Sequence, residues 1–591
     1  MRTLTLSSLF LACACAATDG PAVRSASSGG LHGLFEAEWE QRLLDDPLHA
    51  TAVGRREGAH RLPAVDPRAL AVQAERDEHT LAQLRALDPD ALSDVDRISY
   101  EVFEHMLAGR IADHGFGAWQ IPFNSDSGFH TNFAQLPREV PLATVTDYEN
   151  YTARLLAFPA YVDEQIANMR VGIERGMVQP SVVLIGYEAT MAAHVVDDVQ
   201  QSVFHVPFQS FPSAVPAAER TRLLAEGERA IEVGVVAGYQ RLLTFFVEEY
   251  LPAARESVGC SELPDGLAYY EHLVRFFTTL DTSPAEVHQI GLDEVERIHA
   301  EMVAIIENVG FEGDFAAFLE FLRTDPRFYV ETPEALLERA SRICKRADAA
   351  LPALFGHLPR QPYGVAPVPA HIAPKYTTGR YVPAAEGSTE PGYYWVNTYA
   401  LESRPLYVLA ALSLHEAVPG HHLQHALAAE QRGVPEFRRF LYLPAFGEGW
   451  GLYSERLGLE IGLYEDPYDD FGRLTYEMWR ACRLVVDTGL HVQGWSRQRA
   501  IDYMAQRTAL SLHEVTTEVD RYISWPGQAL AYKTGELEIR ALRSWAEEQL
   551  GPDFDLRAFH DALLENGSVP LSTLRRHIEA FVAERLAECG A

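Results

Sequence analysis

The chain has 591 residues, of which 47% are hydrophobic and 23% are charged, a composition typical of a folded protein rather than a disordered one. Its 83 acidic residues outnumber its 50 basic residues and give a formal net charge of −33. This charge repels nucleic-acid phosphates and anionic lipid headgroups, so neither is an expected partner.

The N-terminus predicts an export signal. Arg2 is followed by the apolar run 4–15 and then by small residues. The run is too short for a permanent membrane helix. We therefore expect residues 1–20 to be removed by a signal peptidase, or a lipid to be attached at Cys13 or Cys15. The protein would then act in the periplasm or cell envelope, with an N-terminal lipid as its only membrane attachment. The alternative is a cytoplasmic protein with an apolar N-terminus.

Most of the chain shows the apolar spacing of amphipathic helices. Four segments show this spacing: 93–113, 216–252, 283–310 and 332–356. The first starts with a Ser/Asp cap, the third with Ser-Pro and the fourth with Thr-Pro, which are typical helix starts. A fifth segment, 376–398, is rich in Gly, Pro, Tyr and Thr and predicts a small extended or hairpin element.

These patterns predict a mostly α fold, a large helical structure with a central cleft and a small β element. The chain shows no internal repeat of solenoid length. We therefore expect one domain over residues 31–590, with a helical lobe at about 31–370 and a metal-site lobe at about 371–590.

A histidine-rich segment, SLHEAVPGHHLQHAL at residues 413–427, nearly matches the zinc-binding helix motif H-E-x-x-H. In that motif two histidines four residues apart share a zinc ion, and the glutamate polarises the water bound to it. His415 and Glu416 fit the first half, but the next histidines come two and three residues late. The segment predicts a metal site only if the chain leaves a regular helix after Glu416.

The candidates for the second metal ligand are His421 and His422. In an unbroken helix His421 would point about 240° away from His415, and His422 would lie about 10 Å further along the axis. Pro419 removes a backbone donor and Gly420 adopts almost any backbone angle, so this pair could loop out and return a histidine to His415. The alternative is a helix that simply ends here, with histidines that bind no metal.

The segment 443–462 predicts a helix that carries Glu448 and Glu455. A catalytic zinc commonly takes two histidines and one carboxylate and keeps a fourth position open. Glu448 is the candidate third ligand, whereas Glu455, on nearly the same helical face, could orient a histidine ligand. Solvated surface carboxylates are the alternative, but the apolar neighbours favour a buried helix, where an unpaired carboxylate would be costly.

Four motifs occur in order along the chain: HEAVPGHHLQ, EGWGLYSE, VDTGLH and YISWPGQALAYKTGELEI. With them the sequence resembles the bacterial family known as domain of unknown function 885, most densely over residues 370–545. Members of that family are often exported proteins or lipoproteins and look like mostly helical zinc metallopeptidases of the gluzincin type. More distantly, the chain is similar to the thimet-oligopeptidase and carboxypeptidase Taq families, whose motif is H-E-F-G-H.

The resemblance implies roles for individual residues. Aligning the Gly-His pair of HEAVPGHHLQ with that of H-E-F-G-H places His421, rather than His422, at the position of the second zinc ligand. Glu416 then matches the catalytic glutamate, and Glu448 matches the third ligand, which in those families also comes from a following helix. The resemblance thus implies a Zn²⁺ ion held by His415, His421 and Glu448.

Candidates for stabilising an oxyanion come from two later segments. In residues 480–495, Asp487 and His491 lie four residues apart on one helical stripe, so Asp487 could fix the tautomer of His491. The alternative there is a surface ion-pair ladder. In residues 521–542, Tyr522 and Tyr532 carry phenols suited to the same role, although tyrosines are also common core residues.

Other residues could bind the substrate. Tyr393, Tyr394 and Asn397 lie in the predicted extended element, which could hold a peptide along an exposed edge strand. A terminal carboxylate of the peptide could be held by a basic residue, for which the candidates are Arg483, Arg521 and Lys533.

The sequence therefore predicts an exported zinc-dependent peptidase of short peptides. Glu416 would take the proton from a metal-activated water, and His491, Tyr522 or Tyr532 would stabilise the oxyanion. A zinc amidase or esterase acting on a non-peptide bond would use the same chemistry. A non-catalytic zinc- or peptide-binding envelope protein is the other alternative, but it would have no need of Glu416. The sequence does not indicate an oligomeric state.

Overall fold

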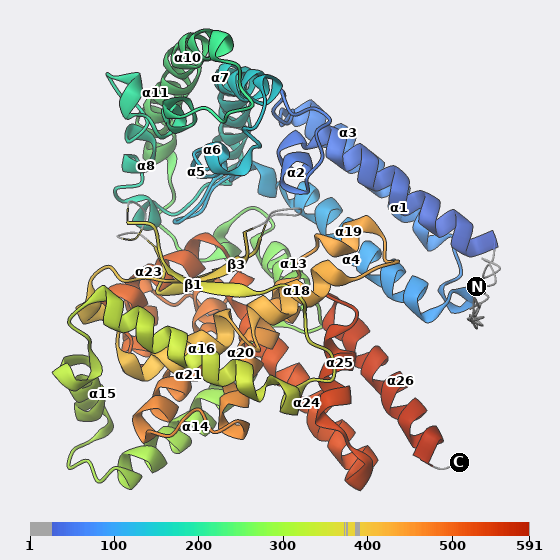
Figure 1. The fold of residues 1–591 in the computed structure, drawn as a ribbon, viewed down its shortest axis with the longest axis vertical. Coiled ribbons are helices and arrows are strands. Elements are labelled where there is room, and N and C mark those ends of the chain that lie inside the picture. Colours follow the sequence, from blue (N-terminus) through green and yellow to red (C-terminus); the bar gives the residue numbers. More distant parts are fainter. Residues whose placement is uncertain (1–25, 371–372, 374–375, 385–389, 590–591) are drawn as a thin grey trace, which may run out of the picture.

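A computed structural model describes residues 26–370, 373, 376–384 and 390–589. The predicted export segment, residues 1–20, lies outside the described residues. Helices make up most of the described chain, so the predicted mostly α fold is confirmed (Figure 1). The central cleft stays a prediction.

The N-terminal half of the chain forms two groups of helices. Helices α1, α3 and α4 run along one side of the molecule, and α5 to α11 form one end of it (Figure 1). The bounds are α1 Ala26–Asp45, α2 Pro47–Ala52, α3 Pro67–Arg85, α4 Asp94–Phe116, α5 Phe129–Phe133, α6 Leu136–Glu139, α7 Val145–Arg175, α8 Ala189–Ala192, α9 Val206–Gln209, α10 Ala217–Ala230, α11 Ala237–Phe245 and α12 Leu251–Ala253.

The continuous helical run Ala217–Ala253 is long and apolar enough to cross a membrane by length and composition. Half of its apolar window is buried inside the protein, and both α10 and α11 pack against α7. Two π-helical stretches, Ile231–Val236 and Phe246–Tyr250, lie within the run. The run is thus part of the helical packing at this end of the molecule.

The middle of the chain contains four helices and a three-stranded sheet. The helices are α13 Gly266–Thr278, α14 Pro284–Asn308, α15 Phe315–Thr324 and α16 Pro333–Leu354, and the strands are β1 Tyr363–Pro367, β2 Gly379–Val382 and β3 Gly392–Val396. The strand order is β1-β3-β2, with β1 parallel and β2 antiparallel to β3. The predicted extended element contributes β2 and β3, whereas β1 precedes it.

The central position of β3 corrects the expectation of an exposed edge at Tyr394 and Asn397. The side chain of Tyr394 is fully buried. Asn397, also buried, donates from its amide to the carbonyl oxygens of Ala373 and Tyr376. The edge strands are instead β1 and β2, and Tyr381 of β2 pairs with Tyr394 of β3 in the register.

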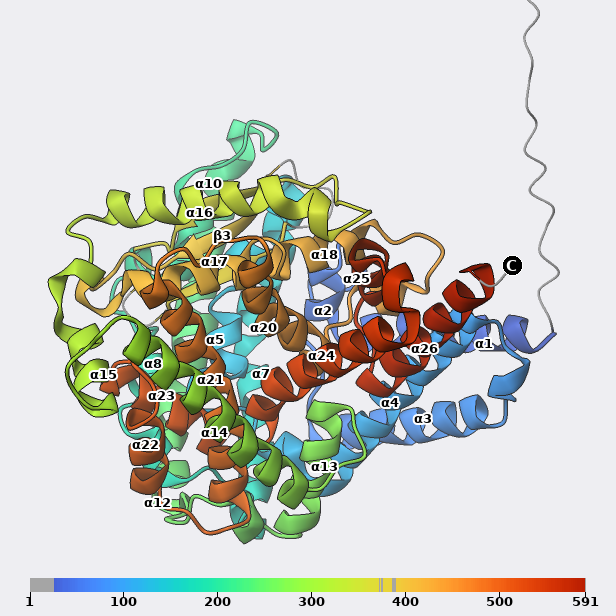
Figure 2. The ribbon, with the colours of Figure 1, turned by 90° about the horizontal axis from the view of Figure 1, so that it is seen from below.

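The C-terminal part is again helical. Its helices are α17 Leu409–Glu416, α18 His421–Glu430, α19 Glu436–Arg439, α20 Pro444–Glu460, α21 Pro467–His491, α22 Arg497–Ala505, α23 Leu512–Ser524, α24 Ala531–Leu550, α25 Leu556–Leu564 and α26 Leu571–Cys589. Helix α21 packs along α14, and α20 packs along α24 (Figure 2). A Cβ on Gly449 would lie 2.6 Å from the Cα of Gly535, so α20 and α24 approach closely because both residues lack side chains.

The four helices predicted from the sequence are present, and three begin at the expected caps. Ser93 accepts from the third backbone N–H of α4. Ser283 and Thr332 cap α14 and α16 in the same way, with a proline at the first helical position of each.

Two large hydrophobic cores connect distant parts of the sequence. One joins the helices at the α5–α11 end to α14, α21 and α23. The other joins α1, α3 and α4 to α20 and the C-terminal helices, as when the ring of Phe437 packs on those of Phe35 and Phe103. Both cores thus include residues from either side of the predicted lobe boundary near residue 370.

Candidate metal centre

The helix that carries the histidine motif breaks after Glu416. Helix α17 ends at this residue, α18 begins at His421, and the Val418–Pro419 peptide between them is cis. A Cβ on Gly420 would lie 1.9 Å from the carbonyl oxygen of His415, so only glycine allows the loop to approach the helix this closely. The loop therefore returns the start of α18 to the end of α17.

The return brings three candidate ligands together. The Nε2 atoms of His415 and His421 lie 3.3 and 3.5 Å from one carboxylate oxygen, Oε2 of Glu448. One ligand atom from each residue lies within 4.8 Å of the other two. Zinc–ligand bonds of about 2.1 Å in a tetrahedron place ligand atoms about 3.4 Å apart. The two distances to Glu448 thus match a single zinc ion.

The adjacent His422 points elsewhere. Its Nδ1 lies 3.0 Å from the hydroxyl oxygen of Tyr381, and its ring packs on Tyr363 with centroids 4.6 Å apart. Of the two histidines that the sequence offers as second ligand, the structure therefore brings His421 to Glu448.

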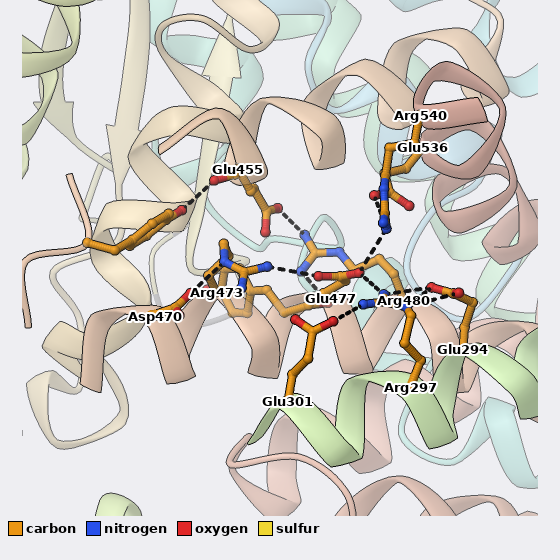
Figure 3. A network of polar contacts seen from close by, with 12 residues as sticks. Glu294, Arg297, Glu301, Glu455, Asp470, Arg473, Glu477, Arg480, Glu536 and Arg540 are labelled. Carbon is orange, nitrogen blue, oxygen red and sulfur yellow. Dashed lines mark hydrogen bonds and ion pairs between the residues drawn. The ribbon is translucent and has the colours of Figure 1, made fainter. Parts of the chain in front are cut away.

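Glu455 lies behind the first histidine. Its Oε1 is 2.8 Å from Nδ1 of His415, and Nη2 of Arg480 lies 3.5 Å from the same oxygen. Figure 3 shows the carboxylate of Glu455 on α20 pointing to Arg480 of α21. A carboxylate at Nδ1 keeps the proton on that nitrogen and leaves Nε2 free to bind a metal. Glu455 thus occupies the orienting position considered from the sequence.

The electrostatics of the cluster favour a cation. Burial lowers the pKa of His415, but hydrogen bonds to Glu448 and Glu455 outweigh it and raise the pKa to about 9. Burial would raise the pKa of Glu448, yet its contacts with His415 and His421 hold that pKa well below its ordinary value. The cluster thus attracts positive charge, which a proton or a metal ion can supply.

The candidate base lies beside the ligands. Glu416 is 92% buried, since its relative exposure is 8%, and its Oε2 accepts a hydrogen bond of 2.8 Å from the backbone N–H of Tyr381 on β2. The other carboxylate oxygen has no such contact with the strand. Glu416 is therefore held in place by one oxygen while the second can accept a proton.

Tyr442 is a site residue that the sequence analysis did not single out. Its hydroxyl donates to Oε1 of Glu448 at 3.0 Å, and its ring stacks on His425 with an interplanar angle of 10°. A Cβ on Gly447 would lie 2.2 Å from the tyrosine ring, and one on Gly451 would lie 2.7 Å from the ring of His415. The alternating glycines of GEGWG, residues 447–451, are the sequence signal for these close contacts.

His491 and Asp487 do not form the expected pair. Nδ1 of His491 accepts from the backbone N–H of Cys260, and Nε2 lies 3.0 Å from the carbonyl oxygen of Tyr522. Asp487 instead accepts from the hydroxyl of Tyr270 at 2.5 Å. Burial lowers the pKa of His491 to about 3. Both ring nitrogens are therefore engaged inside the protein, which corrects the expected pairing.

The two tyrosine candidates differ in their surroundings. The buried hydroxyl of Tyr522 donates to Glu518 at 2.7 Å and accepts from Trp479 and Arg483 at 2.9 Å. Tyr532 is half-buried, and burial and the charge of nearby Glu448 raise its pKa. Of the two phenols, that of Tyr532 is therefore the one whose pKa responds to the charge of the candidate ligand Glu448.

The basic residue Lys533 belongs to a separate ionic network. Its ammonium group is fully buried and lies within 2.9 Å of three carboxylates, from Glu294, Glu477 and Glu536. Figure 3 shows these glutamates with their arginine partners on α14, α21 and α24. Lys533 is therefore not available to hold a substrate carboxylate, contrary to the expectation from the sequence.

Comparisons with known proteins extend over nearly the whole chain. A "putative lipoprotein" from Colwellia psychrerythraea has a structure similar to this one, with a TM-score of 0.89 and 28% identity over 95% of this chain and 100% of that one. A "putative lipoprotein of unknown function" from Shewanella oneidensis gives a TM-score of 0.71 and 20% identity over 94% and 99% of the two chains. No curated protein matches the sequence significantly. The model of the family described as "Bacterial protein of unknown function (DUF885)" matches residues 47–578, and the chain therefore belongs to this family.

Proposed function

We propose that the protein is a zinc-dependent peptidase that hydrolyses short peptides. The observation that carries this proposal is the convergence of His415, His421 and Glu448, in which both histidine Nε2 atoms lie 3.3 and 3.5 Å from Oε2 of Glu448, close to the spacing of ligands on a tetrahedral zinc. A zinc ion bound there would supply a Lewis acid that activates water and polarises a carbonyl group.

The chain's own residues would carry the proton. Glu416 would accept a proton from the attacking water through its free oxygen and deliver it to the leaving amine, while the N–H of Tyr381 holds its other oxygen. The phenol of Tyr532 would donate a hydrogen bond to the oxyanion that develops on the scissile carbonyl. Glu455 would keep His415 in the tautomer that binds metal through Nε2.

We place this activity in the cell envelope. The two structural relatives described as lipoproteins support this location. A signal at residues 1–20 and a lipid on Cys13 or Cys15 would attach the protein there.

The test combines elemental analysis with a digest of a peptide library. The protein, purified without chelators, should contain about one zinc per chain and cleave short peptides, and removal of zinc should stop cleavage until zinc is returned. A protein that binds zinc stoichiometrically yet cleaves no peptide, while it hydrolyses simple esters or amides, would contradict the peptidase proposal. Stoichiometric zinc with no hydrolysis at all would instead favour a binding protein.

A further inference from the structure

The basic groups around the candidate metal centre differ in whether a carboxylate of the chain already neutralises them. Arg483 and Arg521 both contact Oε2 of Glu518, at 2.9 and 3.0 Å. The guanidinium of Arg483 is also enclosed, since its central carbon lies 4.2 Å from the ring centroid of Tyr532. Both arginines are therefore already paired with Glu518, although Nη1 of the buried Arg483 has no hydrogen-bond partner among the described residues.

Arg380 on β2 is different. Arg380 is exposed, whereas the residues on either side of it, Gly379 and Tyr381, are buried, so its side chain projects from the face of the sheet opposite to that of Tyr381. Among the residues that the structure describes, no carboxylate lies within 4.0 Å of its guanidinium. In the pairing of β2 with β3, Arg380 lies opposite Trp395. The ring centroids of Trp395 and Tyr376 are 6.0 Å apart.

Arg380 nevertheless lies next to the proposed catalytic residues. The following residue, Tyr381, donates its backbone N–H to Glu416 at 2.8 Å, which fixes β2 against the metal-binding helix. Burial lowers the pKa of Arg380, but the phenol of Tyr376 and the charges of Glu416 and Glu448 outweigh it and raise that pKa. The guanidinium is thus permanently charged and close to the centre.

The nearby carboxylates are committed to other partners. Glu448 faces both histidines with one oxygen and Tyr442 with the other. Glu416 is bonded to the backbone of Tyr381. A guanidinium that lacks an ion-pair partner is suited to a carboxylate from outside, because its planar fork matches the two carboxylate oxygens.

We propose that Arg380 binds a carboxylate group of the peptide substrate. This inference rests on the proposed function and adds to it the substrate class, namely peptides that carry a carboxylate near the cleaved bond. That carboxylate has two sources, the free C-terminus of a short peptide or an aspartate or glutamate side chain.

The experiment compares wild type with Arg380→Gln on three related peptides. The first is a free acid without acidic side chains, the second is its C-terminal amide, and the third is the same amide with one residue replaced by glutamate. If the C-terminus is recognised, the substitution should lower kcat/KM for the free acid by about 10- to 100-fold, the usual scale for a hydrogen bond to a charged group. It should leave the plain amide unchanged. If side chains are recognised, the glutamate amide should show the loss instead.

A matched control is Arg360→Gln. Arg360 lies just before β1, is also exposed, and pairs with Glu430 at 3.2 Å. Its replacement should change none of the three rates. Equal losses on all three peptides in Arg380→Gln would overturn the proposal, because they would indicate a general effect on the centre rather than recognition of a carboxylate.

Binding to the zinc-loaded Glu416→Gln variant separates this proposal from the proposed function. Calorimetry should show that the carboxylate-bearing peptide binds more tightly than the plain amide and that adding Arg380→Gln removes the difference. This result would support Arg380 even if the wild-type protein cleaved no peptide. Equal affinities of all three peptides for the parent variant would overturn the inference even if cleavage were found.

Discussion

Two clusters of buried glutamates in the C-terminal helices balance their charge in different ways. Around Lys533, three glutamates meet an ammonium group and several guanidinium groups, so the chain itself provides the positive charge. Around His415, Glu448 and Glu455 face imidazole nitrogens, which can be neutral. The first cluster is complete as folded, whereas the second attracts a cation.

The two clusters lie on different helices that pack against each other: the ionic network is on α14, α21 and α24, and the imidazole cluster is on α17, α18 and α20. Helix α20 carries Glu448 and Glu455, and Arg480 of α21 approaches Glu455 from the ionic network. We infer that the network fixes the helices rigidly and that the imidazole cluster uses this rigidity to hold its three ligand atoms. Substitutions in the two clusters should therefore have separable effects, on stability in one and on metal in the other.

The largest expected effect is the loss of metal. Replacing His415 or Glu448 by alanine removes one of three protein ligands, so zinc should fall from about one per chain to a trace. Elemental analysis after gel filtration measures this, with circular dichroism as the control for folding. A folded variant that retained stoichiometric zinc would contradict the assignment of the ligands.

In the ionic network the expected effect is on stability. Lys533→Met leaves two buried carboxylates, of Glu477 and Glu536, and the partly buried one of Glu294 without their shared ammonium group and should cost about 3–5 kcal/mol of unfolding free energy. Urea denaturation of the metal-free protein measures the change, and the folded variant should still bind about one zinc. A Lys533→Met variant that lost zinc but kept its full stability would contradict our inference that the ionic network supports stability and the imidazole cluster binds metal.

The next prediction concerns the base. Glu416→Gln keeps the size of the side chain and an oxygen that can accept from Tyr381, so metal content should stay near that of the wild type. Turnover should fall by about 10²-fold or more, the usual scale for removing a general base. Wild-type peptidase rates in this variant would exclude the role proposed for Glu416.

A smaller effect is expected at Tyr442. Its hydroxyl binds the carboxylate oxygen of Glu448 that faces away from the histidines. Tyr442→Phe should weaken zinc affinity by about tenfold, at the lower end of the range for residues that orient a ligand. Competition with a chelator measures the affinity, and X-ray absorption should show whether the released oxygen joins the metal. Unchanged affinity and coordination would mean that the phenol does not position Glu448.

From the sequence we could predict which candidate ligands come together better than we could predict the contacts around them. Local patterns such as the Ser and Thr caps and the Pro-Gly break depend on neighbouring residues, so the helices and the return of the chain could be anticipated. Tyr442 and Arg380 could not, because their roles depend on how α20 and β2 meet helices distant in sequence. His491 has the expected helical spacing from Asp487, but its hydrogen bonds go to Cys260 and Tyr522 across other elements.

The smallest expected effect distinguishes two adjacent histidines in the imidazole cluster. His421→Ala removes a group 3.5 Å from Glu448 and should abolish zinc binding. His422→Ala removes only contacts with Tyr381 and Tyr363, so it should weaken binding by less than about tenfold. A weak effect on zinc affinity is expected because Tyr381, which loses its contact with His422, also donates its backbone N–H to Glu416 beside the candidate ligands. Zinc titrations of the two variants form a matched pair, since both lose an imidazole from the same turn of α18. If His422→Ala loses zinc while His421→Ala retains it, the ligand is His422, and the loop at Pro419 must adopt another conformation when metal binds.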